Sequence, residues 1–361
     1  MDKSTIEEQT NHQSSDSSKN GEKPFVSVII PCRNEENFIA NCLDSIISQD
    51  YPKDRMEILV VDGMSEDKTR EIITNYTHKS HFIKLLDNPK RITPCALNIG
   101  IKEAKGEFIV MIDAHAKYQN TYISKLIKYI TKYNADNIGG IAKASILKDN
   151  LTPEAITIAL SHPFGTGNSY FRIGVNSPKE VDTVFGGCFR KEIFNKIGLF
   201  NENLARNQDF ELNTRLRENG GKIILAPDIV TNYYPKQNFW DFFKHDFKNS
   251  FWITYQKKYS KGKYKLRHIS PLIFAVTLIT MGILGIKLKP FLILFLVAIG
   301  AYVLASVYFS IKIAIQKNNL KLIPFLASAF ACRHTAYGTG SIWGLIKVHF
   351  PSKQTNAKTN L

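Results

Sequence analysis

The chain lacks the glycine-rich sequences that bind phosphate in two large classes of enzyme. Neither GxGxxG nor GxxxxGK[ST] occurs in its 361 residues, which weighs against a Rossmann dehydrogenase and a P-loop enzyme. Zinc-finger, RNA-recognition and helix-turn-helix patterns are also missing. The five cysteines form no CxxC pair, so we expect reduced thiols in a cytosolic domain rather than a disulfide framework. The N-terminus has no basic and then apolar signal-peptide pattern.

The formal net charge of +15 does not by itself indicate a nucleic-acid partner. Much of the excess lies beside long apolar stretches. The basic residues before and after those stretches are Lys257, Lys258, Lys261, Lys263, Lys265, Arg267, Lys312, Lys317 and Lys321. This placement fits the positive-inside rule and attraction to anionic lipids, so we expect no nucleic acid and a large N-terminal part in the cytosol.

Two uncharged apolar stretches, 269–286 and 290–311, contain eighteen and twenty-two residues. About 20 residues are needed to cross a membrane, and the short link between the stretches predicts a transmembrane hairpin over 269–311. The preceding residues 236–268 read as an amphipathic, basic juxtamembrane segment. Residues 322–346 are apolar but contain Arg333 and His334, which leaves an interfacial, a re-entrant and a third spanning segment open.

The N-terminal part divides into a polar tail and an α/β domain. Residues 1–23 have almost no apolar side chains, so we expect a disordered tail. Over 24–235 the pattern becomes strands alternating with helices, with strands expected at 25–30, 58–62, 82–86 and 108–113 and helices at 36–49, 66–76 and 93–105. The continuous apolar runs predict a mostly parallel sheet covered by helices on both faces.

Polar residues follow several of these strands, where ligands collect in open parallel sheets. They are the segment 31–35, Asp62, and Asp113-Ala114-His115, and the last indicates a site for a divalent cation and a diphosphate. An ordinary Asp-containing turn is the alternative for Asp113. Further along, 186–189 reads as a glycine loop, with packing as its alternative. Asp209 and Glu211 open a helix, where acids are favoured electrostatically even without a function.

Four motifs in this order resemble family 2 glycosyltransferases of the GT-A fold. They are VSVIIPCRNE at 26–35, VVDGMS at 60–65, DAH at 113–115, and the later Asp209. The chain is more similar to bacterial exopolysaccharide enzymes of the succinoglycan-biosynthesis type. Those enzymes carry Asp-Ala-His where most relatives have Asp-x-Asp, and they have a membrane-bound C-terminal part.

The resemblance implies a role for each matching residue. Those expected to bind the nucleotide sugar are Pro31, Arg33, Glu35, Asp62, Arg91 and Asp113. Asp113 and His115 would bind a divalent metal, Mn²⁺ or Mg²⁺, and the imidazole shifts the preference away from Mg²⁺. Asp209 would be the general base, and Gly187 and Cys188 would belong to the acceptor side.

The implied reaction is an inverting transfer from a UDP-sugar to a hydroxyl of a lipid-linked saccharide. Polysaccharide-assembly proteins are possible partners, and we expect a multi-pass protein of the bacterial plasma membrane. The Gln-x-x-Arg-Trp signature of processive synthases is absent, so we expect one sugar addition per acceptor. Two alternatives stay open: a polyprenyl-phosphate sugar synthase, and a non-catalytic membrane scaffold that binds a nucleotide sugar.

Overall fold

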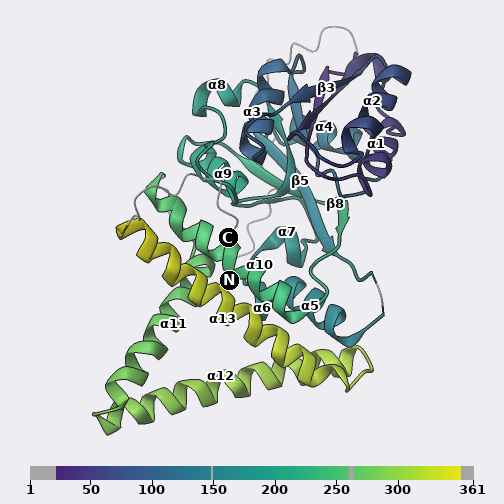
Figure 1. Cartoon of the computed structure of the whole chain (residues 1–361). Coiled ribbons are helices and arrows are strands. Elements are labelled where there is room, and N and C mark those ends of the chain that lie inside the picture. Colours follow the sequence, from purple (N-terminus) through teal and green to yellow (C-terminus); the bar gives the residue numbers. More distant parts are fainter. Residues whose placement is uncertain (1–21, 148, 260–263, 351–361) are drawn as a thin grey trace, which may run out of the picture.

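A mixed sheet with helices on both faces is followed by four long helices (Figure 1). The computed structural model describes residues 22–147, 149–259 and 264–350. The predicted disordered tail, 1–23, therefore lies almost wholly outside the described residues.

Eight strands form the sheet in the order β3-β2-β1-β4-β7-β5-β8-β6. Their bounds are β1 (Val26–Cys32), β2 (Met56–Asp62), β3 (Ile83–Asp87), β4 (Phe108–Met111), β5 (Asn137–Ala144), β6 (Lys179–Glu180), β7 (Phe185–Arg190) and β8 (Ile223–Tyr233). Strands β1 to β4 pair in parallel, as do β5 and β8. Strand β7 is antiparallel to both β4 and β5, and β6 is antiparallel to β8.

Two layers of helices cover the sheet because its central strands are apolar on both faces. Val28 and Ile30 of β1 face the layer of α1, α2 and α4, whereas Ile29 faces α3, α8 and α9. The helices of this part are α1 (Ile39–Ile47), α2 (Thr69–Lys79), α3 (Thr93–Glu103), α4 (Tyr122–Lys132), α5 (Leu151–Ser161), α6 (Pro163–Thr166), α7 (Tyr170–Ile173), α8 (Ile193–Ile197) and α9 (Gln208–Glu218), with short 3₁₀ turns η2 (Lys53–Arg55) and η3 (Gln256–Lys258).

The predicted strands and helices of residues 25–113 are present, with ends shifted by a few residues. The predicted parallel pairing holds on each side of β7, but the sheet as a whole is mixed. The expectation of a loop at 186–189 is wrong, because these residues form part of β7. Gly186 and Gly187 have positive φ angles of 65° and 128°, and a Cβ on Gly187 would lie 2.8 Å from Oδ1 of Asn137. The glycine pair therefore allows close packing within the sheet.

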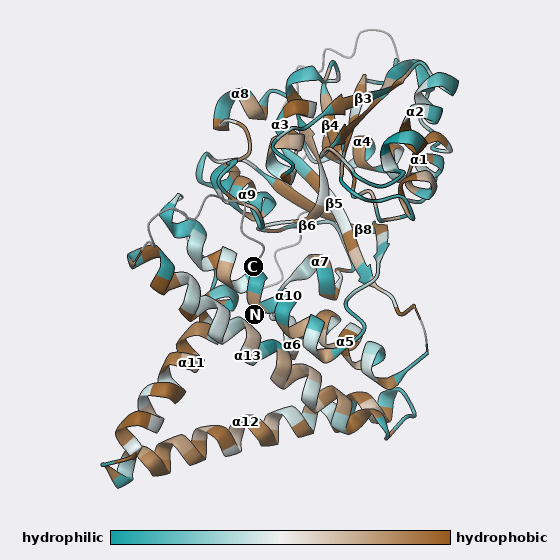
Figure 2. Ribbon diagram, in the orientation of Figure 1, coloured by the Kyte–Doolittle hydropathy of each residue, from teal (hydrophilic) through white to brown (hydrophobic). Residues whose placement is uncertain are grey.

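Four helices make up the C-terminal part: α10 (Phe239–Tyr255), α11 (Leu266–Gly285), α12 (Lys289–Gln316) and α13 (Leu322–His349). By length and composition, α11 and α12 are the two described helices that could cross a membrane. Figure 2 shows how apolar both are along their length. The stretch predicted as interfacial, re-entrant or spanning is one continuous helix, α13, with no turn back, and it packs along α10.

The carboxyl ends of the parallel strands face this helical part. Strands β1, β4, β5 and β8 run in the same direction, since β7 is antiparallel to both of its neighbours. In Figure 1, β5 and β8 run down toward α7 and α5. The sheet edge that commonly binds ligands in such folds is thus next to the apolar helices.

Candidate active site

Three strands bring most of the predicted donor-binding residues to one edge of the sheet. Cys32 at the end of β1 is paired with Asp62 at the end of β2, and β4 lies on the other side of β1. Pro31 is the next-to-last residue of β1, so Arg33 and Glu35 follow directly on the strand. Residues separated by more than fifty positions in sequence therefore meet at one edge, as the alternation of strands and helices predicts.

Asp62 is completely buried, and its carboxylate is already surrounded by donors. It accepts hydrogen bonds from the backbone N–H and the hydroxyl of Ser65, the latter at 2.5 Å, and from Arg70 at 3.1 Å. Arg70 also pairs with Asp87 at the end of β3, at 2.7 Å. Asp62 thus holds the loop after β2 in place. This loop passes beside Arg33.

Arg33 and Arg91 converge on a single carboxylate. Nη1 of Arg91 lies 3.1 Å from Oε1 of Glu66, and Nη2 of Arg33 lies 3.7 Å from the same oxygen. The Glu66 side chain is 66% exposed, so the two guanidinium groups sit at an open surface. The backbone of Arg91 is in the left-handed region, with a φ angle of 60°, which is uncommon for a residue other than glycine. Two cations at this edge are suited to a diphosphate.

Asp113, His115 and Glu35 are grouped beyond the end of β4. Nδ1 of His115 lies 3.4 Å from Oε1 of Glu35. Burial raises the pKa of Asp113; His115 counteracts this in part, and Glu35 adds to it. The hydrogen bond to Glu35 is the main cause that raises the pKa of His115. Asp113 and His115 are thus each affected by the charges of the other two members of the group.

The donor set of this group fits a divalent cation. Asp113 has no cationic partner within 4 Å in the part of the chain that the structure describes, and burial disfavours its charged form. Two side chains, Asp113 and His115, offer an oxygen and a nitrogen ligand. Among the described residues, however, no group of three or more His, Cys, Asp or Glu side chains is arranged to hold a metal. A metal ion bound by Asp113 and His115 would therefore need further ligands from outside these two side chains.

Asp209 lies in the first turn of α9, in the wall of a cavity of about 630 Å³. Its side chain is exposed to the cavity, and the protein atoms that surround the cavity raise the pKa of its carboxyl group by desolvation. The negative charge of Asp113 adds to this shift. The two carboxylates therefore interact electrostatically across this part of the molecule.

Glu211, the other acid of this helix, has a different environment. Its buried carboxylate receives hydrogen bonds of 3.0 and 2.8 Å from Nε and Nη2 of Arg215. Arg215 also donates to the backbone carbonyl groups of Ile197 and Leu199, and so fastens α9 to the loop after α8. Glu211 is thus part of the scaffold, whereas Asp209 has no ion-pair partner within the described residues.

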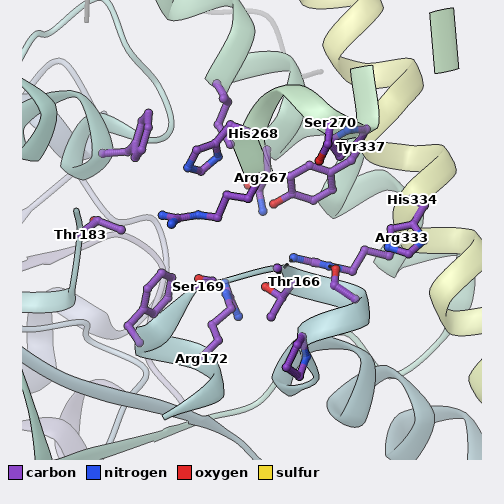
Figure 3. A pocket seen from close by; sticks show the side chains of 18 of the residues that line it. Thr166, Ser169, Arg172, Thr183, Arg267, His268, Ser270, Arg333, His334 and Tyr337 are labelled. Atoms are coloured by element: carbon purple, nitrogen blue, oxygen red, sulfur yellow. Dashed lines mark hydrogen bonds between the residues drawn. The ribbon is translucent and has the colours of Figure 1, made fainter. Parts of the chain in front are cut away.

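The cavity lies between the carboxyl edge of the sheet and the helices α10, α11 and α13 (Figure 3). Its wall contains Thr183, Val184 and Phe185, which lead into β7, and Asn207 beside Asp209. The basic side chains of the wall are Arg172, Arg267, Arg333, His245, His268 and His334. Polar side chains of both the α/β domain and the C-terminal helices thus line the same cavity.

Buried ion pairs hold the helices against the domain. Arg333 of α13 donates to Asp246 of α10 at 2.5 Å, and its Nε donates to the carbonyl of Gly165. Arg267, at the start of α11, pairs with buried Asp182. The sequence showed Arg333 only as a polar residue in an apolar run, and neither Asp246 nor Asp182 follows any motif. Their pairing depends on contacts between distant segments.

Cys188, one of the two predicted acceptor-side residues, does not reach this cavity. Its side chain is completely buried in the core between β4 and β5, paired with Val110 and Ile138. Gly187, in the same strand, is buried beside Asn137. The residues that the structure places at the cavity are instead the three before Gly186. Cys188 is therefore part of the hydrophobic core.

The sequence of the chain is similar to that of a transferase of Methanococcus voltae, and this similarity identifies its family. That transferase is a dolichyl N-acetyl-alpha-D-glucosaminyl phosphate 3-beta-D-2,3-diacetamido-2,3-dideoxy-beta-D-glucuronosyltransferase, 30% identical over 332 residues, which cover 90% of this chain and 98% of the relative. The chain belongs to glycosyl transferase family 2. The model of that family, Glycosyl transferase family 2, matches residues 27–198. The resemblance found in the sequence is thus confirmed.

Two further comparisons concern a relative in sequence and a solved structure with a similar fold. The succinoglycan biosynthesis protein ExoA of Rhizobium meliloti is 28% identical over 222 residues, covering 60% of this chain and 66% of ExoA. The mannosyltransferase PcManGT of Pyrobaculum calidifontis, solved with GDP-Man and Mn²⁺, superposes with a TM-score of 0.55 at 19% identity, covering 87% of this chain and 88% of that one. The fold is therefore the GT-A-like mixed α/β arrangement that the resemblance implied.

Proposed function

We propose that this family 2 glycosyltransferase moves a sugar from a UDP-sugar to a hydroxyl group of a lipid-linked saccharide at a membrane surface. The transfer is metal-dependent and inverts the anomeric carbon. One observation carries this proposal: the carboxylate of Asp209 stands without an ion-pair partner in the wall of a cavity that borders the apolar helices, next to the charge of Asp113.

Asp209 acts as the general base in this proposal. The acceptor oxygen attacks the anomeric carbon, while the bond from that carbon to the diphosphate oxygen breaks and its electron pair leaves with the nucleotide. Asp209 takes the proton of the attacking hydroxyl group. A single displacement of this kind inverts the configuration. General-base assistance contributes about 10²- to 10⁴-fold to the rate.

The donor nucleotide binds along the edge formed by β1, β2 and β4. Arg33 and Arg91 neutralise charge on the diphosphate, and this requires that they leave Glu66, which now holds them. Asp113 and His115 would hold the divalent cation. Such a cation, when bound, stabilises the negative charge that develops on the leaving diphosphate. Asp62 supports this edge by fixing the loop after β2.

Three features favour a lipid-linked acceptor and a membrane location. Helices α11 and α12 expose large apolar side chains along their length, for example Ile283 and Leu304, and such surfaces are costly in water. The cavity with Asp209 opens beside α11 and α13. The similar transferase of Methanococcus voltae is named for a dolichyl-linked sugar phosphate acceptor, and ExoA is named for succinoglycan biosynthesis. The basic residues beside the apolar stretches favour a cytosolic position of the catalytic domain.

Donor-dependent release of nucleotide tests the proposal. Membranes containing the full chain are supplied with Mn²⁺ and a panel of UDP-, GDP- and dTDP-sugars, each with a lipid-linked saccharide or with a plain polyprenyl phosphate. We expect release of UDP that depends on the lipid-linked saccharide. Release with plain polyprenyl phosphate alone would instead identify a polyprenyl-phosphate sugar synthase. No nucleotide release with any pair would favour the non-catalytic scaffold.

A further inference from the structure

Three arginines line the cavity, and two of them are already neutralised. Arg267 pairs with buried Asp182, to which Nζ of Lys265 also lies within 3.5 Å. Arg333 pairs with buried Asp246 at 2.5 Å. Arg267 and Arg333 thus each have a buried carboxylate as counterion and need no ligand. They account for the contacts between the catalytic domain and the helices.

Arg172 is different, because it has no carboxylate partner within 4 Å among residues 22–147, 149–259 and 264–350. It extends from the short helix α7 and donates a hydrogen bond to the hydroxyl of Tyr233. Its guanidinium carbon lies 5.1 Å from the ring centre of Phe171 and 5.5 Å from that of Tyr233. These contacts orient the group but supply no counter-charge, and the carboxylates that interact with it, Asp209 and Asp246, do so without forming an ion pair. In Figure 3, Arg172 and Arg333 reach into the space between α7 and α13 from opposite sides.

The positive charge of Arg172 faces the same cavity as Asp209. Burial raises the pKa of Asp209, and Arg172 is among the groups that counteract this shift. A half-buried cation without an ion-pair partner is stabilised by an anion that enters the cavity. Guanidinium binds phosphate, like carboxylate, through two parallel hydrogen bonds.

The wall also contains apolar and aromatic side chains from the candidate membrane helices. Phe274 and Pro271 come from α11, and Tyr302 comes from α12. Both helices are candidate membrane spans with exposed apolar side chains. A volume of about 630 Å³ lies within the usual range of ligand pockets. The cavity therefore suits a molecule that has a phosphate group next to an apolar chain and a polar group on the side of Asp209.

We propose that Arg172 binds the phosphate of a polyprenyl-phosphate-linked acceptor. The polyprenyl chain then runs along α11 and α12 toward the membrane, and the saccharide extends from the phosphate toward Asp209. This inference rests on the proposed function, since it names the group by which the acceptor is recognised. It assigns a role to a residue that no sequence motif indicates.

Binding of a short polyprenyl phosphate tests the assignment without any sugar transfer. The full chain in neutral detergent micelles is titrated calorimetrically with farnesyl phosphate and, separately, with farnesol. We expect Arg172→Gln to weaken farnesyl phosphate binding about ten- to hundred-fold, as for the loss of charge-assisted hydrogen bonds. Farnesol binding should stay the same in both proteins. Nucleoside diphosphate binding should also be unchanged.

Two variants separate recognition from folding. Tyr233→Phe removes the hydroxyl group that accepts a hydrogen bond from Arg172. The charge of Arg172 remains, so phosphate binding should change little. Arg190→Gln removes the same charge at the other edge of the sheet, where Arg190 contacts Ala135 and Asn134, and should have no effect. If Arg172→Gln unfolds the protein, Arg172→Lys keeps the charge and loses the paired hydrogen bonds, and an intermediate affinity is expected.

Other outcomes would overturn the proposal. Equal loss of farnesyl phosphate and farnesol in Arg172→Gln would mean that Arg172 only shapes the cavity. Binding of inorganic phosphate as tight as that of farnesyl phosphate would mean that the polyprenyl chain is not recognised. Equal competition by phosphatidylglycerol vesicles would mean a general lipid-headgroup site. Failure of the proposed function is seen separately, as absence of nucleotide release from a protein that still binds farnesyl phosphate.

Discussion

Replacing Asp209 by Asn is the most direct test of the candidate active site. The substitution keeps the shape of the side chain and removes the ability to accept a proton. We expect kcat to fall about 10²- to 10⁴-fold, because this is the usual contribution of a general base. That loss corresponds to about 2.7–5.4 kcal/mol of activation free energy. It is measured as acceptor-dependent nucleotide release under donor saturation.

The same substitution should not destabilise the protein. Burial raises the pKa of Asp209, so the folded protein holds that proton more tightly than the unfolded chain does. The stability that this group contributes is present below the ordinary Asp pKa and is lost as the pH rises through the raised value. At neutral pH the charged Asp209 is therefore unfavourable, and Asp209→Asn should unfold at an equal or higher temperature.

Glu211→Gln is the matched comparison, two residues further along the same helix. It leaves Arg215 without its carboxylate, and loss of one partner of such a buried pair costs about 3–5 kcal/mol. Arg215 keeps some solvent contact, so we expect the lower end of this range, with kcat of the folded protein nearly unchanged. The reasoning would be refuted if Asp209→Asn lowered the unfolding temperature as much as Glu211→Gln, or if it kept more than about a tenth of the wild-type kcat.

Three further perturbations test other parts of the molecule. Asp246→Asn leaves Arg333 buried without its counterion, and should lower the free energy of unfolding by about 3–5 kcal/mol in a thermal melt in detergent. Glu66→Gln releases the two guanidinium groups that it holds, and should lower the KM for the donor up to about fivefold, since exposed ion pairs contribute about 0–1 kcal/mol; an unchanged or raised KM contradicts a role of those groups in donor binding. Treatment with EDTA should abolish activity, and His115→Asp should shift the ratio of activities restored by Mg²⁺ and Mn²⁺ toward Mg²⁺, because the carboxylate is a harder ligand; an unaltered ratio means that His115 does not bind the metal.

The donor edge of the sheet could be predicted from the sequence because its signals are local. Continuous apolar runs ending in polar residues specify parallel strands, and the right-handed connections of such strands bring their carboxyl ends together. Arg33, Asp62 and Asp113 were located in this way. The sequence did not indicate that Asp62 is enclosed by Ser65 and Arg70, since side-chain partners depend on the exact path of a loop.

The acceptor side could not be predicted in the same way, because its residues come from segments far apart. Arg172 belongs to a four-residue helix with no periodic pattern, and its neighbour in the cavity, Arg333, lies on α13. The glycine pair before Cys188 suggested a loop, whereas close packing against Asn137 makes it a strand. The resemblance selected Asp209 rather than Glu211, but the sequence did not indicate that Glu211 is buried and paired with Arg215 whereas Asp209 faces the cavity.

The ion pair between Arg333 and Asp246 bears on how this enzyme can be shortened for study. A truncation that ends after β8, at Tyr233, would retain Asp209 and all of the predicted donor ligands, yet it would remove α10, α11 and α13 and with them the far wall of the cavity. Such a fragment would also lose the apolar contacts of α5 with α10, α12 and α13. Inhibitors that compete with the acceptor would have to be screened on the full-length chain.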